Sequence, residues 1–281
     1  MESPKIPRFC LYCGSHHFTN VFIYDSPPEG ETKFQFSSSG SYLREVWRCN
    51  LCSHFISIHN MDISTLYDDD YVSSCYHHED GIARAFKRII SLPPFQSDNM
   101  GRVQRILDFA TSYFAHAAKN IVLSLLDVGS GLGVFPCKIK EAGWDCTALD
   151  PDMRSVKHTR EVVGVKAIHG DFMEIQDIGQ FNVITFNKVL EHVENPISML
   201  AKSLTHLHCD GFVYVEVPDG ESAVIEGERR EEFFIEHPHI FSFTSLSLLA
   251  IKANFSVQTL ERIHEPSGKY TLRVFLTPNE F

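Results

Sequence analysis

The sequence predicts an α/β protein in which helices cover both faces of a parallel sheet, with a small cysteine-rich domain at the N-terminal end. From about residue 100, short apolar runs alternate with segments of helical periodicity, which is typical of βαβ units. One apolar run, 125–128, leads into three glycines at every second position. Near the N-terminus, four cysteines form two C-x2-C pairs.

Composition restricts the class of protein. The 281 residues are 43% hydrophobic, enough for one large domain or two smaller ones. The net charge of −11 argues against a duplex nucleic-acid partner, because such proteins carry a basic face. No apolar run approaches the ~20 residues of a membrane span, and residues 1–14 lack the apolar core of a signal peptide. We therefore expect a cytoplasmic protein with no membrane partner, whose cysteines are thiols or metal ligands.

The four N-terminal cysteines predict a metal site. Cys10 and Cys13 form one pair, Cys49 and Cys52 the other, with 35 residues between the pairs. Four thiolates suit a tetrahedral Zn²⁺ and leave no open coordination position, so the predicted role is structural. Predicted strands at 18–25 and 42–49 complete a zinc ribbon, assigned to residues 1–65 with a bridging segment at 66–100. Reduced cysteines without metal, or an iron–sulfur cluster, are the alternatives.

The remainder of the chain, 101–281, is predicted to form the α/β domain. Its helices are amphipathic, and its strands are short apolar runs bounded by turn residues. Pro266 and Gly268 divide two late strands, 255–263 and 270–276, which we expect to form a hairpin. The other strands are predicted at 120–127, 145–149, 165–168, 181–186 and 211–217, and the helices at 103–117, 134–142, 152–163 and 196–208.

The glycine-rich turn predicts a ligand that approaches the backbone. Gly129, Gly131 and Gly133 lie between a strand and a helix, and residues without Cβ allow both a sharp turn and a close ligand. A dinucleotide fingerprint has the spacing G-x-G-x-x-G, whereas here Val134 stands where the third glycine would be. Asp127 precedes the turn, and a carboxylate there suits a ligand with a cationic amino-acid portion better than a pyrophosphate.

Further polar residues follow the other strands. Asp150 ends the second strand and can accept both hydroxyls of a ribose. Asp171 and Phe172 follow the third strand, where an acid and a flat ring could hold an adenine. Asn187 follows the fourth, close to where the reacting group is expected. Because the carboxyl ends of parallel strands share one edge, these residues are predicted to form one ligand site.

The ordered motifs DVGSGLG (127–133), ALDPD (148–152), GDF (170–172) and FNVITFNKVLEHVENP (181–196) resemble class I S-adenosylmethionine-dependent methyltransferases. The resemblance implies a Rossmann-like sheet of seven strands with the last one antiparallel. It implies that Asp127 and the glycines contact the methionine portion, that Asp150 binds the ribose and that Asp171 with Phe172 holds the adenine. Ser130, Pro151 and Asn187 lie within the same motifs and are predicted to belong to the cofactor site.

The four-cysteine domain and the segments YDDDYVSS (67–74) and EHPHIFSFTSLSLLAIKANF (236–255) support a narrower resemblance. This resemblance is to sugar C-methyltransferases and related glycan and natural-product methyltransferases. It implies that Tyr67 and Tyr71 help to close the cofactor site, that Glu236 and His237 serve in deprotonation, and that the acceptor is a nucleotide sugar. The family pattern has tyrosine and histidine where this chain has Phe234 and Ile235, so O- and N-methylation stay open.

Transfer to a weakly acidic hydroxyl, or to a carbon beside a carbonyl, needs a base. His237 beside Glu236 is the first candidate for that base, His239 the second and His192 the third, since histidine titrates near neutral pH. S-adenosylhomocysteine would be the product.

Three other functions remain open. A nicotinamide oxidoreductase would need the missing third glycine. A non-catalytic adaptor would act through its zinc ribbon. A methyltransferase of a protein or RNA is the third, although the acidic charge disfavours RNA.

Overall fold

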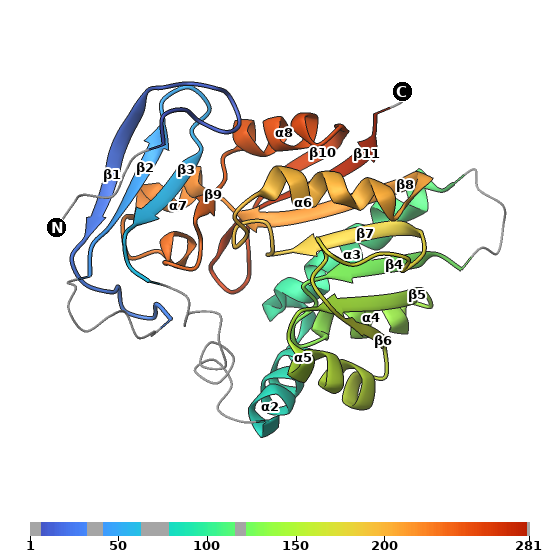
Figure 1. Ribbon diagram of the computed structural model, residues 1–281. Coiled ribbons are helices and arrows are strands. Elements are labelled where there is room, and N and C mark those ends of the chain that lie inside the picture. Colours follow the sequence, from blue (N-terminus) through green and yellow to red (C-terminus); the bar gives the residue numbers. More distant parts are fainter. Residues whose placement is uncertain (1–6, 33–41, 63–78, 116–121, 280–281) are drawn as a thin grey trace.

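The computed structural model describes residues 7–32, 42–62, 79–115 and 122–279. A small sheet near the N-terminus lies beside a larger sheet with its helices (Figure 1). Tyr67 and Tyr71 fall outside the described residues, so their predicted role stays a prediction. Among the described residues, no helix has the length and apolarity needed to cross a membrane.

The larger sheet has seven strands in the order β10-β11-β8-β7-β4-β5-β6. The neighbours from β8 to β6 are parallel, and β11 runs antiparallel to both β8 and β10. This arrangement confirms the predicted seven-stranded sheet and its closing hairpin. The strands are β4 (Ser124–Val128), β5 (Asp145–Asp150), β6 (Lys166–His169), β7 (Phe181–Asn187), β8 (Leu207–Pro218), β10 (Phe255–His264) and β11 (Tyr270–Pro278).

Two apolar cores cover the two faces of this sheet. Successive strand residues point to opposite faces, so Leu125 belongs to one core and Leu126 to the other. The core of Leu126 includes residues of α6 (Pro196–Lys202) and α8 (Phe243–Lys252). The core of Leu125 includes residues of α3 (Asp98–Tyr113), α4 (Val134–Glu141) and α5 (Met153–His158). Helices on both faces confirm the predicted layer order.

Two predicted helices end earlier than their sequence pattern suggests. The segment 196–208 is helical only to Lys202, and a 3₁₀ turn, Ser203–Thr205, leads into β8. Leu207 already pairs with Phe181 of β7, so strand pairing replaces the last helical turn. In the segment 152–163, α5 ends at His158 and a π-helical turn, Thr159–Val163, follows.

The smaller sheet contains a strand from the other end of the chain. Its order is β1 (Phe18–Tyr24), β2 (Arg44–Cys49), β3 (Phe55–His59) and β9 (His239–Ile240). The sequence pattern predicted the first two strands but neither β3 nor β9. Because Phe55 pairs with Ile240 and Ile56 with His239, the two sheets are tied together close to the predicted catalytic segment.

The remaining elements join these layers. α2 (Glu79–Ile90) lies in the predicted bridging segment and packs against α4 and α5. α7 (Gly220–Glu226) follows β8 and packs against β11. Two further 3₁₀ turns are Pro94–Gln96 and Glu231–Phe233. The boundaries at 65/66 and 100/101 remain predictions.

Candidate active site and metal centre

The four predicted metal ligands come together in the smaller sheet. The Sγ atoms of Cys10 and Cys52 are 3.5 Å apart, those of Cys13 and Cys49 are 3.4 Å apart, and all four lie within 4.8 Å of one another. Sulfur atoms around a tetrahedral zinc, with Zn–S bonds of about 2.3 Å, are about 3.8 Å apart. The cluster therefore fits one Zn²⁺ with a closed coordination sphere.

Each C-x2-C pair forms the same turn. The Gly14 N–H donates to the Cys10 carbonyl (2.9 Å), and the Ser53 N–H donates to the Cys49 carbonyl (3.0 Å). Both residues that close the turns have left-handed backbone, with φ of 75° at Gly14 and 56° at Ser53. Left-handed φ is unfavourable for a non-glycine residue such as Ser53, so the second turn keeps a strained residue next to the predicted metal ligand Cys52.

The glycine-rich turn after β4 leaves backbone uncovered. Gly131 has φ of 52°, and a Cβ there would meet no heavy atom within 4 Å. Gly129 is packed instead, because its Cβ would lie 2.7 Å from a methyl carbon of Val189. The turn therefore has one closed side, against the segment after β7, and one open side on which a ligand can lie.

Asp150, the last residue of β5, holds this turn in place through a hydrogen bond. Its Oδ2 accepts the Gly131 N–H (2.7 Å), and its Oδ1 accepts the Asp152 N–H (2.8 Å). A carboxylate has about four acceptor positions, so two are left for the hydroxyls that the sequence analysis assigned to it. Burial raises the pKa of Asp150 above its ordinary value.

Asp127 is buried at the end of β4. Its Oδ1 accepts hydrogen bonds from Thr185 Oγ1 and Asn187 Nδ2, both at 2.7 Å. Burial nevertheless raises the pKa of this carboxyl to about 7. A cationic ligand beside it would hold the carboxylate in its charged form.

Asn187, the last residue of β7, presents an unsatisfied acceptor. Its Nδ2 is used by Asp127, whereas its Oδ1 is buried and has no hydrogen-bond partner among the described residues. Buried polar atoms are usually paired. An amino group of a bound ligand, placed between this oxygen and Asp127, would satisfy both groups, so the residues present fit the predicted cofactor.

Asp171 and Phe172 separate in the structure. Asp171 is exposed after β6, and its Oδ1 accepts the Met173 N–H (2.8 Å). The Phe172 side chain is 2% exposed and packs on Phe186 and His206. Its ring lies in the core and has no free face for an adenine, which corrects that part of the prediction. In the loop that follows β6, the Phe172 side chain turns inward, whereas the neighbouring Met173 is exposed.

Ser130 and Pro151 contribute through their backbones. The Ser130 N–H donates to the Leu149 carbonyl (3.2 Å), which helps to fix the glycine-rich turn on β5. The Pro151 carbonyl lies 3.0 Å from Nε2 of His169 and links the ends of β5 and β6.

His237 lies in a cluster that the sequence analysis did not foresee. Its ring centroid is 4.8 Å from that of His192, and ligand atoms of Glu191, His192 and His237 all lie within 4.8 Å of one another. Nδ1 of His237 is 3.0 Å from the Glu232 carbonyl, and Nδ1 of His192 is 2.8 Å from the Glu236 carbonyl. Burial lowers the pKa of both histidines.

The other two predicted catalytic residues lie outside this cluster. Oε1 of Glu236 accepts a hydrogen bond from Thr32 (3.3 Å), and burial raises its pKa. His239 is 4% exposed and lies in β9, with Nδ1 at 3.2 Å from Nε2 of His54. His54 in turn contacts Ser245 Oγ at 3.2 Å. His239 is thus packed where the smaller sheet meets α8.

Three residues of the site were missed. Thr185 binds Asp127, and Glu191 belongs to the histidine cluster. Lys188 follows β7 with a left-handed φ of 61°, and its Nζ donates to Thr271 Oγ1 (2.7 Å). All three lie in the segment 181–196 that was already identified, but only Glu191 adjoins a candidate base, His192. The other two depend on tertiary contacts.

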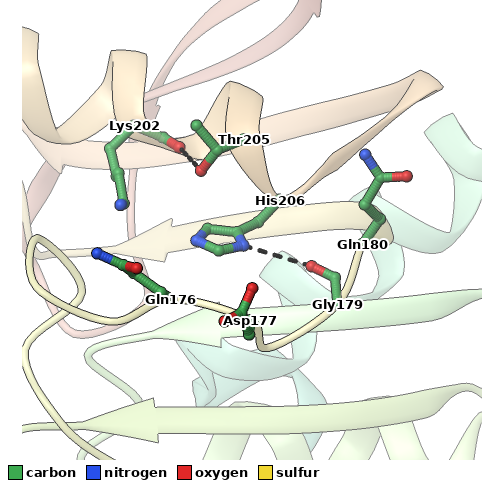
Figure 2. A pocket seen from close by; sticks show the side chains of 7 residues that line it. All are labelled: Gln176, Asp177, Gly179, Gln180, Lys202, Thr205 and His206. Carbon is green, nitrogen blue, oxygen red and sulfur yellow. Dashed lines mark hydrogen bonds between the residues drawn. The ribbon is translucent and has the colours of Figure 1, made fainter.

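A separate pocket lies at the opposite edge of the sheet. Figure 2 shows it beside His206, whose Nδ1 is 3.3 Å from the Gly179 carbonyl. Gly179 and Gln180 precede β7, and Thr205 and His206 precede β8. It therefore lies at the amino ends of these strands, whereas Asp127, Asp150 and Asn187 lie at the carboxyl ends. Its size, about 550 Å³, would suit a ligand, but none of the predicted site residues lines it.

Sequence comparison finds relatives over part of the chain. One is the ubiquinone biosynthesis O-methyltransferase of Rickettsia felis, 25% identical over 119 residues, which are 41% of this chain and 48% of the relative. Another is the enzyme of the same name from Bordetella avium, 28% identical over 97 residues, which are 32% of this chain and 40% of the relative. The chain thus matches about half or less of each relative's length.

Solved structures share the fold at low identity. The 1,6-didemethyltoxoflavin-N1-methyltransferase of Burkholderia thailandensis has a TM-score of 0.54 and 18% identity, covering 81% of this chain and 96% of that protein. The magnesium protoporphyrin IX methyltransferase of Synechocystis PCC 6803 has a TM-score of 0.52 and 14% identity, covering 75% and 100%. A family model described as a methyltransferase domain matches residues 77–260, more than half of the chain. With the strand order and the glycine-rich turn, this match shows that the chain belongs to the methyltransferase-domain family and has the class I S-adenosylmethionine-dependent methyltransferase fold.

Proposed function

We propose that this protein transfers a methyl group from S-adenosylmethionine to a small-molecule acceptor, and that the acceptor is a nucleotide sugar or a glycan precursor. The observation that carries the first part is the pair Asp127 and Asn187 beside the open side of the glycine-rich turn. A buried carboxylate and an unsatisfied amide oxygen together favour a cationic donor.

Each end of the cofactor has its own residues in this proposal. Asp127 and Asn187 bind the amino group, the backbone around Gly131 lies along the ligand, and Asp150 accepts the ribose hydroxyls. Asp171 is exposed and holds the edge of the adenine. When bound, S-adenosylmethionine supplies a methyl group on a positively charged sulfur, which is already a strong electrophile. The chain therefore mainly has to align the acceptor and exclude water.

The names of the relatives and of the similar structures support a small acceptor. They refer to ubiquinone biosynthesis, to a toxoflavin precursor and to a magnesium porphyrin. The sugar is a finer proposal, and it rests on the resemblance of the zinc domain and of segment 236–255 to sugar methyltransferases. An acidic chain can still bind an anionic nucleotide through a few local residues.

Among the three predicted catalytic residues, we favour His237. Its ring lies beside that of His192. His192 belongs to the segment after β7, in which Val189 packs against Gly129 of the glycine-rich turn. His239 instead packs on His54, and Glu236 faces Thr32. His237 is therefore the residue that we propose to promote deprotonation of the acceptor.

We assign the four-cysteine centre a structural Zn²⁺. The closed thiolate sphere leaves no position for a substrate. Such a site needs reduced cysteines, which supports the cytoplasmic location predicted from the sequence.

The test is a transfer assay with isotopically labelled S-adenosylmethionine, the zinc-loaded chain and a panel of nucleotide sugars that includes keto-sugars. Binding of S-adenosylhomocysteine, measured by calorimetry, shows that the protein is folded. We expect label in a sugar, and NMR of the new methyl group then separates carbon, oxygen and nitrogen transfer.

Two outcomes contradict the proposal at different levels. Cofactor binding without transfer to any sugar rejects the sugar acceptor and moves the search to other metabolites and proteins. Failure to bind either form of the cofactor rejects the methyltransferase activity and favours an adaptor.

A further inference from the structure

The cluster around His237 has the composition of a metal site. It contains a carboxylate, Glu191, and two imidazoles, His192 and His237, with their ligand atoms within 4.8 Å of one another. Two of these residues lie in the turn after β7, and the third precedes β9. The His239 N–H donates to the Glu191 carbonyl (3.4 Å), which holds the two segments together.

The carboxylate of Glu191 is buried without a hydrogen bond among the described residues. The residue is 0% exposed, and neither carboxylate oxygen has a hydrogen-bond partner among the described residues. Burial raises its pKa to about 7. The positive charge of Lys188 lowers this pKa, although its ammonium group donates its hydrogen bond to Thr271. A buried, unpaired carboxylate is costly, so a proton or a cation has to balance it.

The two imidazoles are oriented as metal ligands are. Nδ1 of each ring contacts a backbone carbonyl, which can only accept, so Nδ1 carries the hydrogen and Nε2 carries the lone pair. Within the described part of the chain, no hydrogen bond engages either Nε2. Histidines that bind metals usually donate their other N–H to a carbonyl or a carboxylate in this way.

We propose that Glu191, His192 and His237 bind a divalent transition-metal cation, separate from the four-cysteine centre, which holds a hydroxyl group of the acceptor. Two imidazole nitrogens and one carboxylate suit Zn²⁺ and its neighbours, whereas Mg²⁺ and Ca²⁺ prefer oxygen ligands. Three protein ligands leave coordination positions open for the acceptor.

This cation gives His237 its role in the proposed function, on which the inference rests. A bound cation lowers the pKa of a coordinated hydroxyl, so the acceptor proton passes to solvent. The acceptor oxygen then forms a bond to the methyl carbon, the carbon–sulfur bond of the donor breaks, and its electron pair stays on sulfur. His237 acts as a ligand in this step rather than as the base.

The position of the cluster agrees with that step. Val189 contacts Gly129 of the cofactor turn, and the His192 N–H donates to the Val189 carbonyl (3.0 Å). The cluster therefore shares the segment after β7 with the side chain that packs against the cofactor turn. Lys188 and Lys269 are the two lysines whose charge lowers the pKa of His237. Of these, Lys269 is paired with Glu231 (3.1 Å).

The test measures the number of zinc ions bound per chain. The tag-free full-length chain is equilibrated with excess Zn²⁺, freed of unbound metal on a desalting column and analysed by elemental mass spectrometry. We expect two zinc ions per wild-type chain and one in Glu191→Gln. The matched control is Glu194→Gln, the same change at an exposed position in the same loop, which should keep two.

Binding of S-adenosylhomocysteine separates this inference from the proposed function. Glu191→Gln should bind it as the wild type does, with transfer lost, because the variant affects only the acceptor side. Should Glu191→Gln not fold, His192→Gln replaces it in the same count. One zinc ion in the wild type, or equal counts in wild type and folded variant, overturns the inference whether or not the cofactor binds.

Discussion

Asp127 shows how a buried charge can prepare a binding site at the scale of one residue. Its side chain is almost fully buried, with two hydrogen bonds to Oδ1, yet burial raises its pKa to about 7 from an ordinary 3.8. The ligand-free protein therefore holds this carboxyl only partly charged near neutral pH. The counter-charge is expected from the cofactor.

The sign of the pH effect on stability follows from this shift. Between about pH 4 and pH 7 the folded protein binds a proton at Asp127 that the unfolded chain has released. Stability of the ligand-free protein consequently falls as the pH rises through that window, and the full cost remains above it. Cofactor affinity has the opposite dependence, because the cationic amino group needs the ionised carboxylate.

We predict that Asp127→Asn weakens binding of S-adenosylhomocysteine about 10- to 100-fold at pH 8, since a hydrogen bond to a charged group contributes ~1.5–3 kcal/mol. The same change should raise the unfolding free energy of the ligand-free protein by on the order of 2 kcal/mol, because it removes the buried charge. Calorimetry and urea unfolding measure the two effects.

Asp145→Asn is the control, because Asp145 is exposed at the start of β5. In the wild type, affinity should fall below pH 7, and in Asp127→Asn it should lose this dependence. A pH-independent wild-type affinity between pH 6 and pH 8 would contradict the role given to Asp127.

At the scale of elements, strand β2 holds the loop that carries His237. The side chains of Arg44 and Glu31 are fully buried, with Nη2 of Arg44 2.7 Å from Oε1 of Glu31. Nη1 of Arg44 donates to the Phe233 carbonyl (2.6 Å), and the Ile235 N–H donates to Oε1 of Glu31 (2.8 Å). The pair thus replaces the hydrogen bonds that an irregular buried loop would otherwise lack.

We predict that Arg44→Met destabilises the protein by about 3–5 kcal/mol, because it leaves Glu31 as an uncompensated buried charge. The double variant with Glu31→Gln should recover part of this loss, since it buries no charge. Arg48→Met is the control on the same strand, at an exposed position. Urea unfolding gives the free energies, and a loss in Arg44→Met no larger than in Arg48→Met would refute the prediction.

At the scale of the whole molecule, the four-cysteine sheet and the larger sheet share structure. Strand β9 pairs with β3, and Ser242 Oγ donates to the Cys52 carbonyl (2.5 Å), next to a metal ligand. Tyr12 and Phe241, from opposite ends of the chain, lie in one core with ring centroids 5.8 Å apart. We therefore expect loss of zinc to lower methyl transfer to the acceptor more than it lowers affinity for the cofactor.

We predict that Cys13→Ser removes the structural zinc and lowers the thermal midpoint by about 5 °C or more, since each kcal/mol lost shifts it by ~2–4 °C in chains of this size. Methyl transfer should fall much further than affinity for S-adenosylhomocysteine. Cys209→Ser changes an exposed cysteine outside the centre and should behave as the wild type. Equal losses of transfer and of cofactor affinity would argue against separate effects on the two sides of the site.

The residues of the candidate cofactor site could be named from the sequence because their signals are local. An acid or amide residue after an apolar run marks the carboxyl end of a predicted strand. In a parallel sheet, these carboxyl ends lie along one edge. Asp127, Asp150 and Asn187 were placed together by this rule alone. The two cysteine pairs were equally readable, since each forms its own turn within five residues.

Only the tertiary structure decided the residues whose role depends on distant partners. Strand β9 has two residues and no periodicity of its own, and it exists because β3 offers a free edge. The Glu191 cluster joins the turn after β7 to a loop some 45 residues later, and the burial of Phe172 depends on its contacts with Phe186 and His206. Local patterns determine elements and the edge at which they end, whereas contacts between distant segments are set by packing and burial.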